Sequence, residues 1–214
     1  MLGNMMLENM TALLPTFIKE KGWDSTSEDP KPPLISGFEQ ALILSIFSIA
    51  QIIFAPLNAI IKNKWGAKNT ILFGFGILTL ATFGLGGIAR FENSRAFLYV
   101  ALGLRFLQGQ GDVLLQITGY SIVTSVFNDQ VLKYMSYIEI AVGFGLGVGP
   151  VIGEILDAQF GYEITMYFFG LINLVGVLIC FAMIPNELNQ TASDEEVAEF
   201  QAKKSDLLTA TGVQ

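Results

Sequence analysis

The stretch AFLYVALGLRFLQGQGDVLLQITGYSIVTSVF, from Ala96 to Phe127, is apolar enough to cross a bilayer apart from a few polar side chains, among them Arg105. A charge at the centre of a membrane helix costs about 2.5–3.5 kcal/mol on insertion scales, and it is tolerated mainly where it faces a protein interior or an aqueous cavity. The stretch therefore predicts a membrane helix whose arginine lies beside a polar pathway.

Apolar runs of similar character recur along the whole chain. The others are Met1 to Ile18, Ile35 to Ile61, Thr70 to Ala89, Met135 to Leu156 and Ile164 to Ile184. Most reach the roughly 20 residues that a spanning helix needs, whereas barrel strands would alternate over segments of about ten. The sequence predicts an all-α, multi-pass integral membrane protein, with a six-transmembrane-helix bundle in residues 1–185 whose first helix is truncated.

Composition supports a membrane location and narrows the chemistry. The chain is 52% hydrophobic and 14% charged, against about 25% charged residues in soluble domains. It has no histidine, which excludes histidine-based metal sites, triads and proton relays, so any proton chemistry must use carboxylates. The single cysteine, Cys180, excludes an internal disulfide. We expect no cofactor, no metal and no nucleic-acid partner.

The end of the chain differs from the apolar runs. Residues 186–214 are acidic and predict a solvated tail or a linker between two halves, with a short amphipathic helix capped by Ser193 and Glu196. Lysine and arginine are almost evenly divided between the two sets of loops, so the positive-inside rule assigns no orientation.

The polar side chains of the Arg105 run have a helical spacing. Arg105, Gln108, Asp112 and Gln116 follow one another at three- and four-residue steps, which predicts that they share one helix face. Arg105 and Asp112 would be roughly 10 Å apart along the axis, too far for a tight pair within one helix. The run from Ile35 adds a second set of polar residues at helical spacing, which comprises Ser45, Ser48, Gln51 and Asn58.

Two further carboxylates, Glu139 and Glu154, stand near opposite ends of the following run. Together with Arg105 and Asp112 they would cost roughly 10–14 kcal/mol if all faced lipid, so we expect most of them to face inward. One interpretation is substrate or proton coupling, and the other is a buried pair that only fixes helix register. The coupling hypothesis assigns the role to Arg105, Gln108, Asp112, Gln116 and Glu139.

Glycine is concentrated in the run from Met135 to Leu156. The residues concerned are Gly143, Gly145, Gly147, Gly149, Pro150 and Gly153. Small residues at such steps let two membrane helices approach closely, and a proline kinks a helix. The run predicts a helix-packing motif formed by Gly145, Gly149, Pro150 and Gly153, and tight packing alone would explain it.

Three motifs, taken together, resemble the major facilitator superfamily. The segment from Arg105 to Gly111 is similar to its fourth-helix motif, and Ala59 to Lys68 to its loop between helices two and three. Gly145 to Gly153 is similar to the fifth-helix motif of its proton-coupled antiporters. From Pro15 to Pro185 the chain resembles the vesicular amine and polyamine transporter branch, solute carrier family 18, and related proton-coupled drug antiporters.

The resemblance implies an amino-terminal six-helix half with both ends cytoplasmic, and an exchange of protons for an organic cation. Glu139 would suit a cationic substrate, and Arg105 would be a coupling residue. The loop would act as a gate through Asn63, Lys64, Gly66 and Lys68. Its pattern departs from the superfamily, because Asn63 stands where an aspartate is usual, Ala59 where a glycine is usual and Ala67 where a base is usual. Asp112 stands where a small residue is usual, and Glu154 where a glycine is usual.

These features leave three hypotheses for function. The first is half of a proton-coupled secondary transporter that binds a small-molecule substrate together with a second six-helix half. The second is a non-transporting membrane subunit, or a truncated transporter product, that keeps the fold for assembly. The third is an intramembrane enzyme, for which the sequence offers no nucleophile with an adjacent base. The sequence identifies neither the substrate nor the particular membrane.

Overall fold

The computed structural model describes residues 2–184 and 186, and among them it contains helices and no strand. The helices are α1 (Leu2–Glu20), α2 (Gly37–Trp65), α3 (Ala67–Gly87), α4 (Ser94–Val126) and α5 (Val131–Met183), with the short 3-10 turns η1 (Ile88–Arg90) and η2 (Asn128–Gln130). Gly161 interrupts α5 with a non-helical conformation, so the described chain has six long helical segments. The predicted all-α membrane fold is confirmed. The predicted acidic tail, except for Asn186, lies outside the described residues.

Membrane-spanning character is unevenly divided among the helices. By length and hydropathy, Gly37–Trp65, Ala67–Arg90 and Val131–Met183 could each cross a membrane. The 33-residue α4 is long enough but is not in this group. Its buried polar side chains, described below, lower its hydropathy. Therefore α4 is the helix that carries the two most deeply buried charged side chains of the described residues, Arg105 and Asp112.

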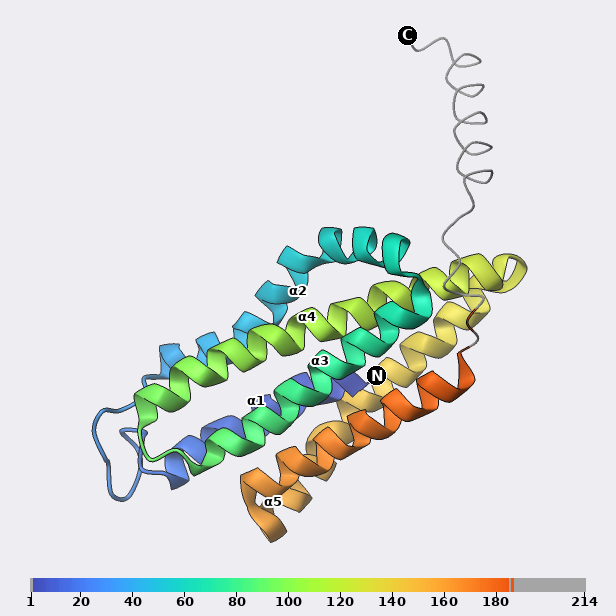
Figure 1. The fold of residues 1–214 in the computed structure, drawn as a ribbon. Coiled ribbons are helices and arrows are strands. Elements are labelled where there is room, and N and C mark those ends of the chain that lie inside the picture. Colours follow the sequence, from blue (N-terminus) through green and yellow to red (C-terminus); the bar gives the residue numbers. More distant parts are fainter. Residues whose placement is uncertain (1, 185, 187–214) are drawn as a thin grey trace.

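Glycine turns reverse the chain at opposite ends of the bundle (Figure 1). Gly66 separates α2 from α3 with φ 80° and ψ 165°, and Gly161 divides α5 with φ 79° and ψ 166°. Positive φ is readily available only to glycine. The loop expected within Ala59 to Lys68 is therefore wrong in extent, because α2 continues to Trp65, α3 begins at Ala67 and the chain turns at Gly66 alone. Lys62 and Lys64 lie in the last turn of α2, where the helix dipole stabilises positive charge.

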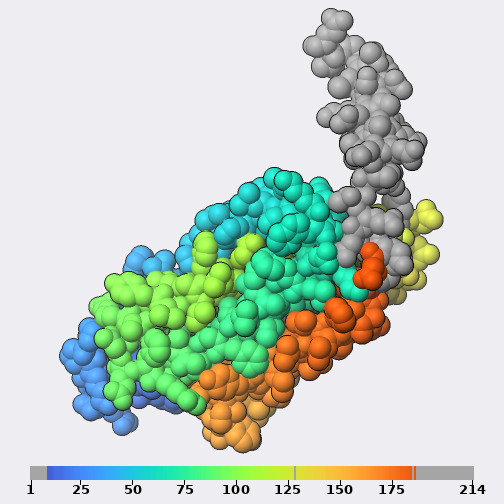
Figure 2. All heavy atoms as spheres, in the orientation of Figure 1, coloured from blue at the N-terminus to red at the C-terminus, as the bar shows by residue number. Residues whose placement is uncertain are grey.

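The helices pack in a fixed order around α4 (Figure 1). The main contacts of α4 are with α2 and α3. In turn α3 packs on the part of α5 that follows Gly161, where the Tyr167 ring lies against Gly86 and the Phe83 ring against Gly170. Side chains of α3 fill the space between α4 and this part of α5 (Figure 2). The α1 helix packs mainly on α5.

The hydrophobic core is concentrated at the end of the bundle that residues 21–36 close. Phe17 stacks on Tyr162 with ring centroids 4.4 Å apart, and Trp23 and Phe97 pack around the same ring cluster. All four side chains are at most 6% exposed. Trp23 comes from the connection and the other three from helices, so this cluster holds the connection onto the bundle.

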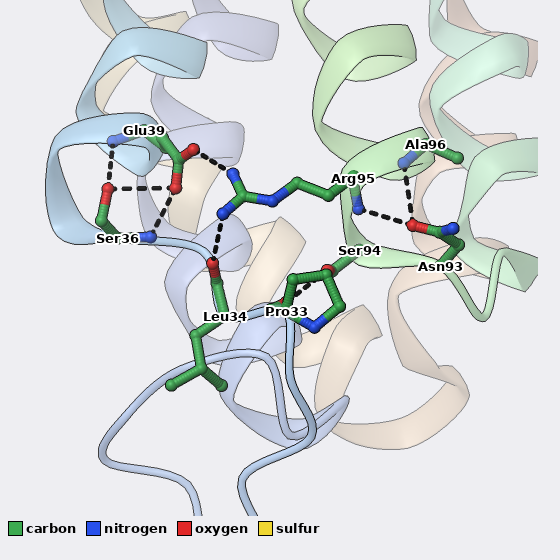
Figure 3. A network of polar contacts seen from close by, with 8 residues as sticks. All are labelled: Pro33, Leu34, Ser36, Glu39, Asn93, Ser94, Arg95 and Ala96. Carbon is green, nitrogen blue, oxygen red and sulfur yellow. Dashed lines mark hydrogen bonds and ion pairs between the residues drawn. The ribbon is translucent and has the colours of Figure 1, made fainter.

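Polar contacts clamp the same connection to the start of α4 (Figure 3). Ser36 caps α2 in a capping box with Glu39. The Glu39 carboxylate also forms an ion pair with Arg95, whose second amino group donates to the Leu34 carbonyl at 3.2 Å. Asn93 caps α4 by accepting from the backbone of the next turn. The starts of α2 and α4 are thus fixed to each other.

Glycines permit the close crossings of α4 with both neighbours. A Cβ atom added at Gly109 would lie 2.2 Å from the Phe47 carbonyl oxygen of α2, and one at Gly111 would lie 2.8 Å from the Gly74 carbonyl oxygen of α3. Real Cβ atoms do not approach backbone so closely. The glycines of the Gln-Gly-Gln-Gly sequence therefore set the distance between these three helices.

We expect Gly109→Ala to destabilise the protein by about 1–3 kcal/mol, because the new methyl group would overpack the α2–α4 crossing. Gly103→Ala in the same helix is the matched control, since a Cβ there meets nothing within 4 Å. The control should be neutral or stabilise the helix by up to about 1 kcal/mol. Thermal unfolding in detergent compares the two variants. Equal melting temperatures would contradict the close contact between α2 and α4 at Gly109.

Candidate functional site in the bundle interior

The polar stripe of α4 faces the interior of the bundle. Arg105 is 0% exposed, Gln108 1% and Asp112 2%, while Gln116 is half-buried. The structure therefore brings together four of the five side chains to which the sequence assigns coupling. In a membrane bundle such placement protects charge from lipid, and intramembrane charges of this kind mark functional sites.

The Arg105 guanidinium is held without a carboxylate. Its Nη1 donates to Gln108 Oε1 at 2.9 Å, and its Nε lies 3.5 Å from the Ile43 carbonyl oxygen. The guanidinium carbon stands 4.8 Å from the centre of the Phe47 ring, a distance typical of a cation–π contact. Its Nη2 has no hydrogen-bond partner among the described residues. The carbonyl dipoles of Gln108 and Ile43 and the Phe47 ring stabilise this charge, but no described carboxylate neutralises it.

A chain of hydrogen bonds continues from Arg105 to two other helices. Gln108 Nε2 donates to Thr82 Oγ1 of α3 at 2.9 Å, and Asn173 Nδ2 of α5 lies 3.5 Å from the same oxygen. The Thr82 hydroxyl donates to the Leu78 carbonyl at 2.7 Å. The sequence reasoning missed Thr82 and Asn173. An asparagine inside the apolar run from Ile164 to Ile184 was the available signal.

Among the described residues Asp112 has amide partners and no ion pair. Its Oδ2 accepts from Gln51 Nε2 of α2 and from Gln116 Nε2, both at 2.6 Å. The ion pairs among the described residues join Arg90 to Glu163 and Arg95 to Glu39, and both lie at the end of the bundle that holds the aromatic cluster. Within the part of the chain that the structure describes, Arg105 and Asp112 are thus buried opposite charges without ion pairs.

The two carboxylates of α5 that were predicted to face inward do not do so. Glu139 and Glu154 are both exposed on the described chain, so the expectation of inward placement is wrong for them. Glu139 Oε1 accepts from the Tyr120 hydroxyl at 2.6 Å. The reason is that α5 presents a different face to its neighbour α1. Gly143 and Gly147 follow Glu139 at four-residue steps and also meet open space.

The predicted packing glycines lie on the buried face of α5. Gly145, Gly149 and Gly153 are buried at four-residue steps, and Pro150 is half-buried. A Cβ at Gly153 would lie 2.3 Å from Asn9 Oδ1 of α1. Asn9 is fully buried, and its amide has no partner among the described residues. Gly153 therefore allows α1 to approach α5 closely.

The predicted gating residues do not form one cluster. Asn63 and Lys64 are exposed at the end of α2, and Gly66 forms the turn. Lys68 is buried instead, with Nζ donating to Asn186 Oδ1 at 2.9 Å and lying 5.2 Å from the centre of the Phe181 ring. Lys68 thus joins the start of α3 to the end of α5.

A pocket of about 250 Å³ opens between α3, α4 and both parts of α5. Its apolar walls come from Ile71, Phe75, Leu115, Ile138 and Val142, and its polar lining includes Asp112, Gln116 and Tyr120. Within the described residues no group of three or more acidic or cysteine side chains could hold a metal ion. The lining is thus mostly apolar, with one carboxylate and a few uncharged polar groups on the α4 side.

Comparisons with known proteins agree with this architecture. The family model described as Major Facilitator Superfamily matches residues 1–211. The MFS-type transporter SLC18B1 of Mus musculus is 25% identical over 161 residues, which cover 73% of this chain and 35% of the relative. The quinolone resistance protein NorA of Staphylococcus aureus is 23% identical over 199 residues, 92% of this chain and 45% of the relative. The chain thus spans less than half the length of these curated relatives.

We expect Thr82→Val to destabilise the bundle by about 1–2 kcal/mol, because it leaves the amides of Gln108 and Asn173 without their acceptor. Thr79→Val is the matched control. Thr79 lies on the same helix and is 5% exposed, but its hydroxyl has no partner among the described residues. This control should be neutral or stabilising. Chemical denaturation in detergent measures the free energy of unfolding of both variants. A loss of stability no larger for Thr82→Val than for Thr79→Val would contradict the hydrogen-bond network.

Proposed function

The chain belongs to the major facilitator superfamily, and from that membership we propose that it is the amino-terminal six-helix half of a secondary transporter. The transporter exchanges protons for a small organic cation or a drug-like solute across a lipid bilayer. The names of the relatives, a transporter and a quinolone resistance protein, support this class of substrate. The motifs that resemble proton-coupled antiporters support the coupling.

The observation that carries the proposal is the burial of Arg105 and Asp112 without an ion pair to any described residue. An ionised carboxylate in a dry interior is unfavourable unless a positive species compensates it. Either a proton or a cationic substrate can do so at Asp112, and the two would compete for one carboxylate. Such competition is the requirement for exchange, because binding of one species releases the other.

Arg105 would act as the fixed positive charge of the same helix face. It is 0% exposed and donates to Gln108, so its position is set by the bundle. Two helical turns, roughly 10 Å along the axis, separate it from Asp112. At that distance in a region of low dielectric its field still acts on the carboxylate and disfavours a second bound cation.

A second six-helix half is the expected partner. Transporters of this type move a midplane site between the two membrane faces by rocking two repeated units against each other. The exposed face of α5 that carries Glu139, Gly143 and Gly147 contacts the Tyr120 hydroxyl at Glu139 and is open at both glycines, so it could meet that partner. Glu139 would then contribute to the pathway between the halves.

A non-transporting membrane subunit is the second candidate. It is favoured by the hydrogen bonds from Arg105 through Gln108 to Thr82 and Asn173, since these tie α3, α4 and α5 together and have a structural role by themselves. On this hypothesis Arg105→Ala lowers the stability of the bundle or its association with a partner. It changes no transport activity, because the subunit transports nothing.

We expect membrane vesicles that contain the chain together with a second six-helix half to take up a fluorescent organic cation when a pH gradient is imposed. The carboxyl-terminal half of the mouse relative supplies that second half, and vesicles with the chain alone should show no uptake. Asp112→Asn and Glu139→Gln should each abolish uptake, because neither amide exchanges a proton with a cation.

Glu154→Gln is the matched control for this experiment, since Glu154 is an exposed carboxylate of the helix that carries Glu139. It should retain uptake. Undiminished uptake by Glu139→Gln would remove Glu139 from the pathway. Uptake at the same rate with and without the pH gradient would exclude proton coupling. No uptake at all, with both halves present, would favour the subunit hypothesis.

A further inference from the structure

A second pocket, of about 180 Å³, lies at the connection between α4 and α5. This connection stands at the end of the bundle opposite the aromatic cluster around Phe17 (Figure 1). The apolar run of α4 ends here, and the polar residues 128–130 separate it from α5. The pocket therefore lies where the hydrocarbon region of a bilayer gives way to lipid headgroups. Its lining, which is distinct from that of the pocket beside Asp112, consists of Val126, Phe127, Asp129, Gln130 and Tyr134.

Aromatic rings form one wall of this pocket. The Phe127 and Tyr134 rings stack with their centroids 4.0 Å apart, and the Tyr137 ring meets Tyr134 edge to face at 6.0 Å. Phe127 is 37% exposed, so part of its surface is open to a ligand. Aromatic faces attract cations, and groups of such rings recognise quaternary ammonium ligands. This wall therefore suits a methylated ammonium group.

Two opposite charges border the aromatic wall. Asp129 lines the pocket, and Lys133 stands in the first turn of α5 with Nζ 5.9 Å from the centre of the Tyr134 ring. Lys133 Nζ also lies 3.5 Å from Gln130 Oε1. Neither Asp129 nor Lys133 takes part in an ion pair with a described residue. The site thus offers a carboxylate to a cation and an ammonium group to an anion.

The headgroup of phosphatidylcholine carries both matching charges. Its trimethylammonium group has no N–H donor, so it needs a carboxylate and aromatic surface but no further hydrogen-bond acceptors. Its phosphate suits a cation such as Lys133. The acyl chains need apolar surface next to the headgroup, which Val126 and Leu132 provide, since they are 51% and 85% exposed.

We propose that the connection between α4 and α5 binds one phosphatidylcholine molecule, with the trimethylammonium group on Asp129 and the Phe127 ring and the phosphate on Lys133. The bound lipid would join the end of α4 to the start of α5 at the membrane surface. This site requires only that the chain lies in a membrane, so it is independent of the exchange function proposed above.

Native mass spectrometry of the purified full chain in detergent tests the site. Dioleoyl-phosphatidylcholine and dioleoyl-phosphatidylglycerol are titrated separately, because they share acyl chains and phosphate and differ in the ammonium group. The unmodified chain should bind one phosphatidylcholine at least about fivefold more tightly than phosphatidylglycerol. Asp129→Asn and Phe127→Leu should each reduce this ratio to below about twofold, because each removes part of the ammonium site.

Glu92→Gln and Tyr99→Leu are the matched controls, since both residues are exposed and lie at the start of α4, at the other end of the bundle. Both variants should keep the ratio of the unmodified chain. Lys133→Gln should weaken the binding of both lipids by a similar factor of about threefold, because the phosphate is common to them.

Equal affinity of the unmodified chain for the two lipids, or an unchanged ratio in Asp129→Asn, would overturn the proposal. Glycerophosphocholine, which has the headgroup without acyl chains, should compete only at a concentration at least about a hundredfold higher than that of the lipid, because it buries no acyl methylenes. Competition at equal concentration would show a site for a soluble headgroup and would also overturn the lipid assignment.

Discussion

A guanidinium enclosed in a membrane-spanning bundle without a carboxylate to neutralise it is the constraint on which the packing of this protein depends. Arg105 is compensated by Phe47 of α2 and by Gln108 of its own helix. Gln108 in turn requires an acceptor, which is Thr82 of α3. These contacts are possible only if α2 and α3 both approach α4 closely. Gly109 and Gly111 allow that approach, so the arginine and the glycines of one short segment act together.

The two ends of the bundle differ in character. The end closed by residues 21–36 carries the aromatic cluster around Phe17 and both ion pairs, so its helices are fixed by apolar burial and by charge. The pocket beside Asp112 lies toward the other end of the bundle, between α3, α4 and α5.

Several features could be predicted because they depend on helical spacing or on the cost of burying charge. The common face of Arg105 and Asp112 is one, and the long axial separation that keeps them from pairing is another. The turn at Gly66 could not be predicted, since lysines look like loop residues in a composition scan but also suit a helix end. Glu139 and Glu154 were expected inside because the cost of lipid exposure was applied to them, yet both are exposed on the described chain, and Glu139 contacts only the edge of α4 through the Tyr120 hydroxyl.

The sequence by itself determined that this is a helical membrane protein and where most of its helices lie. It also determined that one helix has charged side chains within an apolar segment. Those properties follow from local hydropathy and from the 3.6-residue repeat, which need no knowledge of neighbours. Only the tertiary structure decided that Gln51 and Gln116 hold Asp112, that Thr82 and Asn173 complete the Arg105 network, and that Cys180 shares a pocket with Asp112. Such contacts join residues far apart in the chain, and their geometry depends on how closely the helix backbones can cross.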